Sequence, residues 1–160
     1  MGPMRWIITV SAIASLLFLG LAILSGWGLS GAYVPSLTDG FPATLYLEKY
    51  SSGGHLLRSI HYYSCSGLVF SGFVFLSFFY ISGFTAKYRK TWILGVMLYL
   101  LIMGSAFTGY VLPMDQNAYW GTMVRLGITD TVPLVGTAIA DFLRGGATIN
   151  NATLPRLFTL

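Results

Sequence analysis

The chain has 160 residues, of which 55% are hydrophobic and 9% charged, with one cysteine and a formal net charge of +4. Soluble domains carry about 25% charged residues, so this composition excludes an ordinary soluble enzyme and a disordered tail. The single cysteine excludes a disulfide scaffold. Nine scattered basic residues form no basic patch, so no nucleic-acid partner is expected. The composition is typical of a protein embedded in a lipid bilayer.

Three uncharged stretches are long enough to cross the ~30 Å hydrocarbon core of a bilayer as helices. They predict an all-α membrane protein with spanning helices at about 6–30, 60–83 and 92–112. The first apolar run is longer than the core of a secretory signal, and no clear cleavage site follows it. We therefore interpret it as a true span.

The segment 115–160 is different, because charges, prolines and glycines interrupt it throughout. Residues at about 117–126 and 132–143 have apolar side chains at helical spacing, which predicts two helices lying in the outer membrane interface. No internal repeat or linker divides the sequence. Residues 1–160 are therefore expected to form a single membrane domain.

The basic residues predict the orientation of the chain. The densest cluster is at 87–90, between the second and third predicted spans, and Arg5 precedes the first. By the positive-inside rule both lie inside, so the N-terminus is inside and the loop at 31–57 is outside. The two basic residues of that outer loop region weaken this bias without reversing it.

Both histidines of the chain, His55 and His61, lie near the start of the second predicted span. An ionisable side chain there is a functional hypothesis; a hydrogen-bonded structural histidine is the alternative, above all for His55. Arg58 lies one turn before His61 on the same face. This pair suits a haem, because the imidazole can bind the iron and the guanidinium can pair with a propionate. The alternative for Arg58 is that its side chain snorkels to the membrane interface. Gly26 and Gly109 lie at about the depth of His61, where glycines give a macrocycle room.

A specific resemblance rests on GHLLRSIH at 54–61, on Trp92 and Gly95, and on AFTGYVLPMDQNAYWG at 106–121, followed by VPLVG, a Gly-Gly pair and ATLPRLF. In order and with few length changes, these stretches resemble the N-terminal half of cytochrome b of quinol:cytochrome c oxidoreductases. The resemblance implies four helices that enclose two haems, one near each membrane face. Each haem would be held by one histidine of the second helix and one of the fourth.

Carried over by position, the resemblance implies that the outer haem site is intact. It makes His61 the iron ligand and Arg58 a partner of the propionates, with Gly26 and Gly109 giving space. Arg156 matches a basic residue near the same propionates. One haem b on the outer side is therefore expected.

The resemblance also implies that the inner haem site is lost. Phe75 stands where the second ligand of that helix is expected, and Phe78 stands where a basic residue is common. Ala12 replaces a glycine, and only Gly95 is kept. Because phenylalanine has no lone pair for iron, the inner haem is expected to be absent.

The end of the sequence bears on the second ligand of the outer haem. Thr153–Leu160 resembles the segment that directly precedes the fourth-helix histidine in the family. As printed, the chain is an incomplete four-helix haem bundle. The alternatives are a ligand from a second chain, a five-coordinate haem or no haem, and a fragment of a longer gene is a further explanation.

The resemblance finally implies one wall of an outer quinol-oxidation pocket. Tyr110, Met114, Tyr119 and Gly121 match that wall, and its other wall would have to come from a partner. Interfacial anchoring is the alternative role of these residues. Cys65, one turn after His61, is interpreted as a small packing residue, since one cysteine makes neither a disulfide nor a metal cluster.

Two functions from different classes follow. The first is a membrane electron-transfer subunit that binds one outer haem b through His61 within a larger quinol-oxidising, respiratory or photosynthetic complex and is not active alone. The second is a haem-free scaffold subunit derived from cytochrome b. In both cases the expected partners are other subunits and lipid, with quinol or quinone for the first. The expected location is the bacterial cytoplasmic or mitochondrial inner membrane.

Overall fold

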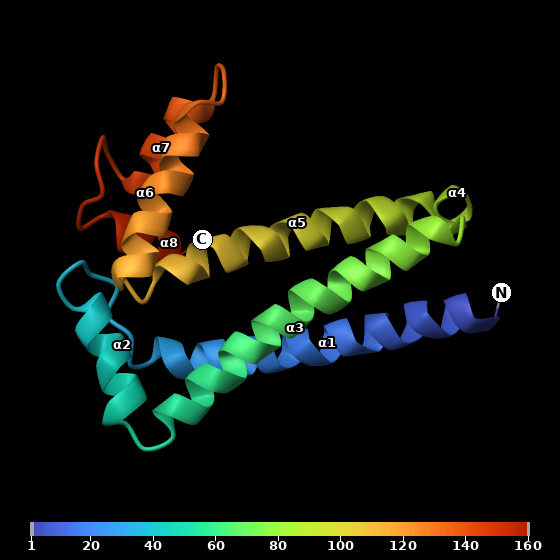
Figure 1. Cartoon of the computed structure of the whole chain (residues 1–160), viewed down its shortest axis with the longest axis horizontal. Coiled ribbons are helices and arrows are strands. Elements are labelled where there is room, and N and C mark those ends of the chain that lie inside the picture. Colours follow the sequence, from blue (N-terminus) through green and yellow to red (C-terminus); the bar gives the residue numbers. More distant parts are fainter. Residues whose placement is uncertain (1, 160) are drawn as a thin grey trace. The chain divides into compact units, whose positions relative to one another are not determined.

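The computed structural model describes residues 2–159, and their regular secondary structure is entirely helical (Figure 1). Met1 and Leu160, the ends of the predicted domain, lie outside the described residues. The long helices are α1 (Gly2–Ser30), α3 (Gly54–Ile81) and α5 (Arg89–Val111). The short helices are α2 (Gly40–Lys49), α4 (Phe84–Lys87), α6 (Gln116–Asp130), α7 (Gly136–Arg144) and α8 (Thr153–Thr159).

The three predicted spans are confirmed, since α1, α3 and α5 are each long and apolar enough to cross a membrane. α3 begins at Gly54, before the predicted start at 60, because its polar first turns continue the helix beyond the apolar stretch. Gly53, with φ at +80°, ends the preceding turn in the left-handed region that favours glycine. The two predicted surface helices correspond to α6 and α7. α2, α4 and α8 are additional.

The chain divides into two compact units. Unit 1 consists of Met1–Gly31 and Ser52–Gly104, and unit 2 of Ala32–Ser51 and Ser105–Leu160. Unit 1 contains α1, α3, α4 and most of α5. Unit 2 contains α2, the end of α5 and the helices that follow it.

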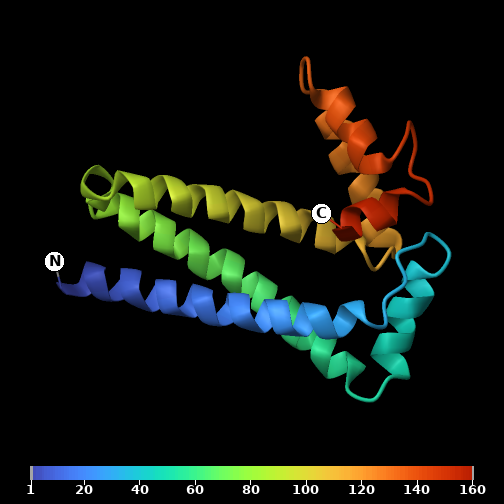
Figure 2. The same cartoon turned by 180° about the vertical axis from the view of Figure 1, so that it is seen from behind.

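In unit 1, α1 packs along α3, and both views of the chain show the two helices side by side (Figures 1 and 2). Small side chains line this contact, and the Ser15 hydroxyl donates to Ser71 Oγ at 2.9 Å. The Phe18 ring covers Gly67 so closely that a Cβ there would lie 2.7 Å from the ring. Small residues let membrane helices approach in this way, so α1 and α3 form a closely packed antiparallel pair.

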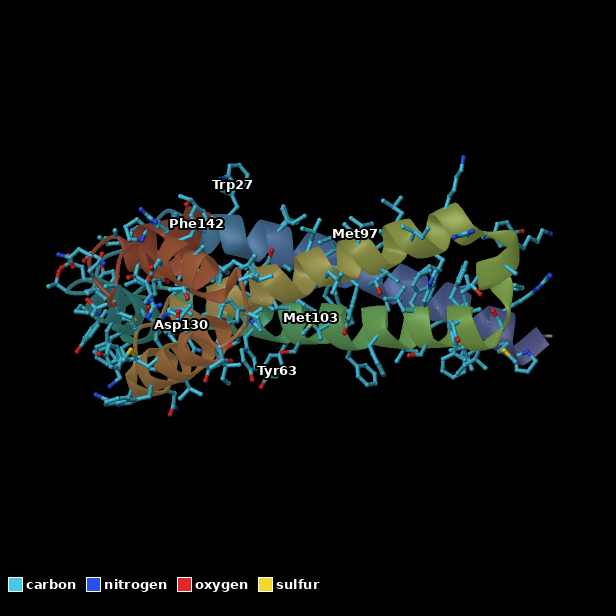
Figure 3. The ribbon with its side chains drawn as sticks, turned by 90° about the horizontal axis from the view of Figure 1, so that it is seen from above. Trp27, Tyr63, Met97, Met103, Asp130 and Phe142 are labelled. Atoms are coloured by element: carbon cyan, nitrogen blue, oxygen red, sulfur yellow. The ribbon has the colours of Figure 1, made fainter. Side chains whose placement is uncertain are left out.

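The surface of unit 1 that faces away from its helix contacts is apolar. Trp27 and Tyr63 point away from their helices, with 78% and 71% of their surface exposed, and Met97 is 56% exposed (Figure 3). The most apolar part of α5 has no buried residue. Near its start, α5 contacts α3 through the Trp92 ring, which stacks on Phe79 with 6.0 Å between centroids. This surface suits lipid tails or the helices of a partner.

Unit 2 has its own core, built from Val111, Leu154 and Leu157. The Tyr33 hydroxyl donates to the Leu112 carbonyl at 2.5 Å. Burial raises the pKa of Tyr33 to about 12, so its hydroxyl keeps the proton that it donates. Tyr33 therefore holds the 32–51 segment against the end of α5.

Candidate functional site

His61 lies on α3 with its imidazole ring against α1. Its Nδ1 atom lies 3.1 Å from the Ala22 carbonyl oxygen and 3.1 Å from Ser25 Oγ. The Ser25 hydroxyl donates its own hydrogen to the Leu21 carbonyl, so its oxygen is left to accept. Because a carbonyl oxygen only accepts, Nδ1 carries the proton of the ring. The lone pair is then on Nε2, the arrangement that prepares a histidine to ligate a metal.

The other ring nitrogen of His61, Nε2, contacts Cys65. The Cys65 Sγ atom lies 3.6 Å from His61 Nε2, one turn further along α3. A thiol is a weak donor, so this contact holds the ring less firmly than the two bonds at Nδ1. Cys65 is therefore a direct neighbour of the imidazole, a contact that its interpretation as a packing residue did not include.

Two glycines near the end of α1 let α3 approach closely. A Cβ at Gly26 would lie 3.0 Å from His61 Cε1, and one at Gly28 would lie 2.9 Å from a methyl group of Leu57. The room that Gly26 makes is therefore taken by the His61 ring itself. Arg58 lies one turn before His61 and is half-buried, whereas His55 is exposed.

The predicted inner position is filled by apolar side chains. At Gly95 on α5, a Cβ would lie 3.3 Å from Leu76 Cδ2 and 4.0 Å from Phe75 Cε1. The Phe75 ring also packs on Phe79, with 5.7 Å between centroids. Phe78 and Ala12 are half-buried. At this level the side chain facing the glycine carries no atom that can ligate iron.

The remaining residues predicted at the haem belong to unit 2. No atom comes within 4 Å of the position that a Cβ would take at Gly109, counting the described residues. Arg156 donates from Nη1 to the Phe142 carbonyl at 2.8 Å, and its guanidinium lies 5.8 Å from the centre of the Phe142 ring. Arg156 therefore satisfies a carbonyl near the C-terminal end of α7.

Two of the four predicted quinol-pocket residues come together around an arginine. The Arg125 guanidinium lies 4.3 Å from the centre of the Tyr110 ring and 5.5 Å from that of Phe107. A Cβ at Gly121 would lie 3.4 Å from Arg125 Nη2, so this glycine leaves space for the guanidinium. Met114 instead packs against the core of unit 2.

Arg125 was missed in the sequence, where it is one cation inside an otherwise apolar helical stretch. Its Nη1 atom is buried without a hydrogen-bond partner among residues 2–159. Tyr119, the fourth predicted wall residue, packs edge-on against Trp120 with 5.2 Å between centroids. Arg125 therefore adds a cation beside two of the four predicted wall residues, Tyr110 and Gly121.

The fold and the site define an all-helical membrane protein that holds an imidazole, hydrogen-bonded through Nδ1, at the contact between two long helices. The chain belongs to the cytochrome b/b6/petB family, because the family model matches residues 4–160. It is 35% identical to cytochrome b6 of Mastigocladus laminosus over 136 residues, which are 84% of this chain and 63% of that relative.

A solved structure has the same architecture. The chain matches a chain titled hyperthermophilic respiratory Complex III with a TM-score of 0.82 and 25% identity, over 95% of this chain and 42% of the other. The chain thus spans less than two thirds of the length of both proteins. Family membership and the integral membrane character are established for the residues printed here.

Proposed function

We propose that this chain is a membrane electron-transfer subunit of the cytochrome b type that binds one haem b on the outer side through His61. One observation carries the proposal: the Nδ1–H of His61 is bonded to the Ala22 carbonyl at 3.1 Å. This bond fixes the tautomer and the orientation of the ring, and it directs the lone pair to Nε2. Nε2 is then the ring atom that a haem iron would bind.

The residues around His61 fit a haem. Nε2 would supply an axial ligand, and the guanidinium of Arg58, one turn away, would balance a propionate. Gly109 and Arg156 belong to unit 2, and the resemblance alone assigns them to the haem. A bound haem would supply one-electron transfer. The chain's own residues would hold the imidazole and balance the charge of the propionates.

We propose further that no haem binds at the inner position. Phe75 and Leu76 fill the space beside Gly95, and neither can ligate iron. With no relay at that level, the chain would not move electrons across the whole bilayer. A complete Q-cycle would then require other redox centres.

The second axial ligand would come from outside residues 1–160, either from a partner chain or from more of the same polypeptide. The same holds for the wall of the quinol pocket that faces Tyr110, Met114, Tyr119 and Gly121. We place the chain in a multisubunit complex of a bacterial cytoplasmic or mitochondrial inner membrane, with the N-terminus inside. The cluster at 87–90 supports this orientation.

The alternative is a haem-free scaffold subunit, and one observation favours it. The space that Gly26 makes is occupied by the His61 ring, as the space at Gly95 is by Leu76. Counting haem b per copy of the chain in its purified native complex, by pyridine haemochrome spectroscopy, separates the two. We expect one haem assigned to this chain. None would establish the scaffold, and two would overturn the proposal for the inner position.

A further inference from the structure

The acidic and basic residues of this chain are divided between the two units. All five acidic residues belong to the segments of unit 2, so unit 1 contains no aspartate or glutamate. Unit 1 nevertheless contains five cations. Four of them, Arg5, Lys87, Arg89 and Lys90, lie at the end where α1 and α5 begin and α3 ends. This end of the paired helices is therefore strongly positive.

Two of these four cations line one cavity. A cavity of about 290 Å³ lies between the first turns of α1 and the short helix α4, and it is lined by Arg5, Ile8, Thr9, Phe84, Lys87 and Tyr88. The Arg5 guanidinium lies 5.9 Å from the centre of the Phe84 ring, and Lys87 Nζ lies 5.3 Å from that of Tyr88. Each cation is thus placed over an aromatic wall of the cavity.

Neither cation of the cavity has a carboxylate partner. Within residues 2–159, Arg5 and Lys87 form no ion pair. Their charges remain available to an anion, because cation–π contacts use the face of a ring and leave the N–H groups of the cations free to donate. The Thr9 hydroxyl donates to the Arg5 carbonyl at 2.9 Å, and its oxygen can still accept.

The position of the cavity indicates the kind of anion. It lies at the end of two helices that can span a membrane, where phospholipid headgroups meet the hydrocarbon core. Its cations suit a phosphate, and Ile8 and Phe84 suit the apolar part next to it. Tyr88 is an aromatic residue of the kind that is enriched at membrane–water interfaces. Basic pockets between membrane helices recognise anionic lipids in this way.

We propose that the Arg5–Lys87 cavity binds the phosphate headgroup of an anionic phospholipid in the leaflet that faces the 87–90 loop. The inference concerns residues that take no part in the proposed haem site, so it stands or falls independently of it. The positive end of unit 1 would then bind a specific ligand, in addition to favouring one orientation of the chain in the membrane.

The experiment uses the purified native complex, exchanged into nanodiscs that contain a few per cent phosphatidylglycerol in phosphatidylcholine. Phosphatidylglycerol bound per complex is measured by native mass spectrometry. The test variant is Arg5→Gln with Lys87→Gln, and the matched control is Arg89→Gln with Lys90→Gln. Both remove two cations from the same end, but only the first pair lines the cavity.

We expect each cation removed from the cavity to lower the affinity for phosphatidylglycerol about fivefold, as for a basic residue close to an anionic surface. The control pair should change it by less than about twofold, as expected for charges outside the cavity. Equal losses in both pairs would mean diffuse attraction and would overturn the proposal. So would an unchanged affinity in the test variant.

Two further measurements distinguish the source of the phosphate and guard against misfolding. Inorganic phosphate at millimolar concentration should not displace the lipid; displacement would assign the cavity to a soluble phosphate instead. Arg5→Lys with Lys87→Arg keeps both charges and should retain most of the binding. If this variant loses the lipid as completely as the glutamine pair while its helical melting curve matches the wild type, a charge-based headgroup site is overturned.

Discussion

Two levels of the same helix, α3, make the most informative comparison in this molecule. At the level predicted to be outer, His61 faces Gly26 of α1, and at the level predicted to be inner, Phe75 and Leu76 face Gly95 of α5. In both cases the side chains of α3 fill the space that the glycine leaves. At the outer level the filling group is an imidazole bonded to a carbonyl, and at the inner level it is hydrocarbon.

The comparison shows that a glycine in a membrane helix does not by itself mark a cofactor site. A glycine permits two helices to approach closely, and the side chain that faces it determines the chemistry of the contact. A half-buried imidazole needs polar partners, which Ala22 and Ser25 provide. A phenyl ring needs only other apolar groups, and Phe75 finds Phe79. The two levels therefore differ in chemistry more than in packing.

The largest effect is expected from His61→Ala. Removal of the only imidazole held at the helix contact should abolish the b-type absorption that this chain contributes to its complex. His55→Ala is the matched control, because His55 is an exposed histidine at the start of the same helix. Reduced-minus-oxidised spectra of both variants check the prediction. An unchanged spectrum in His61→Ala would remove the functional distinction between the two levels.

Phe75→His tests whether the inner level lacks only a ligand. We expect no additional haem, because Leu76 would still fill the space beside Gly95. The buried imidazole should instead lower the stability of the protein by roughly 1–3 kcal/mol, the cost of an unsatisfied polar group. Haem content and thermal unfolding in detergent measure the two effects. A second haem in this variant would show that the packing at this level is no obstacle.

Two glycine-to-alanine substitutions distinguish a loss of space for a haem from a loss of close packing between helices. Gly109→Ala adds a methyl group where no described atom comes within 4 Å, so the apoprotein should be unaffected. The role that the resemblance gives Gly109 predicts that haem affinity falls. Gly95→Ala presses on Leu76 and should cost about 1 kcal/mol of stability, with haem content unchanged. Haem titration and unfolding curves of both variants test this. If Gly95→Ala lowered the haem content and Gly109→Ala did not, the haem would lie at the level of Gly95.

Ser25→Ala is the smallest change in the series. It removes one of the two acceptors at His61 Nδ1 and leaves the Ala22 carbonyl. The haem should stay bound, and its midpoint potential should rise by an amount on the order of tens of millivolts, because a hydrogen bond of about 1 kcal/mol no longer strengthens the imidazole as a donor. Redox potentiometry measures the shift. A lower potential would contradict the assignment of the proton to Nδ1.

The sequence was sufficient for the spans and for the contrast between His61 and Phe75. Hydropathy alone places α1, α3 and α5, since no soluble fold tolerates such long uncharged runs. The family resemblance supplies the expected ligand position. α2 and α8 were missed because they are short and weakly patterned, so that the packing of unit 2, and not local propensity, makes them helical.

Side-chain partners were harder to predict than helices. The bonds that His61 donates to Ala22 and Ser25 depend on the register of two helices separated by a long loop, and no spacing rule fixes that register. The same is true of Phe18 against Gly67. Arg125 could not be recognised because its neighbours, Tyr110 and Phe107, come from a different helix.

The hydrogen bond from Tyr33 to Leu112 has a consequence for how the chain is made. It joins a residue just after the first span to one just after the third, and the rest of unit 2 is assembled from the same two stretches. The ribosome must therefore finish α5 before α2 can find its partners. Until then the core residues Val111, Leu154 and Leu157 of unit 2 have not been made. The pair α1 and α3, in contrast, is complete as soon as residue 81 has been inserted.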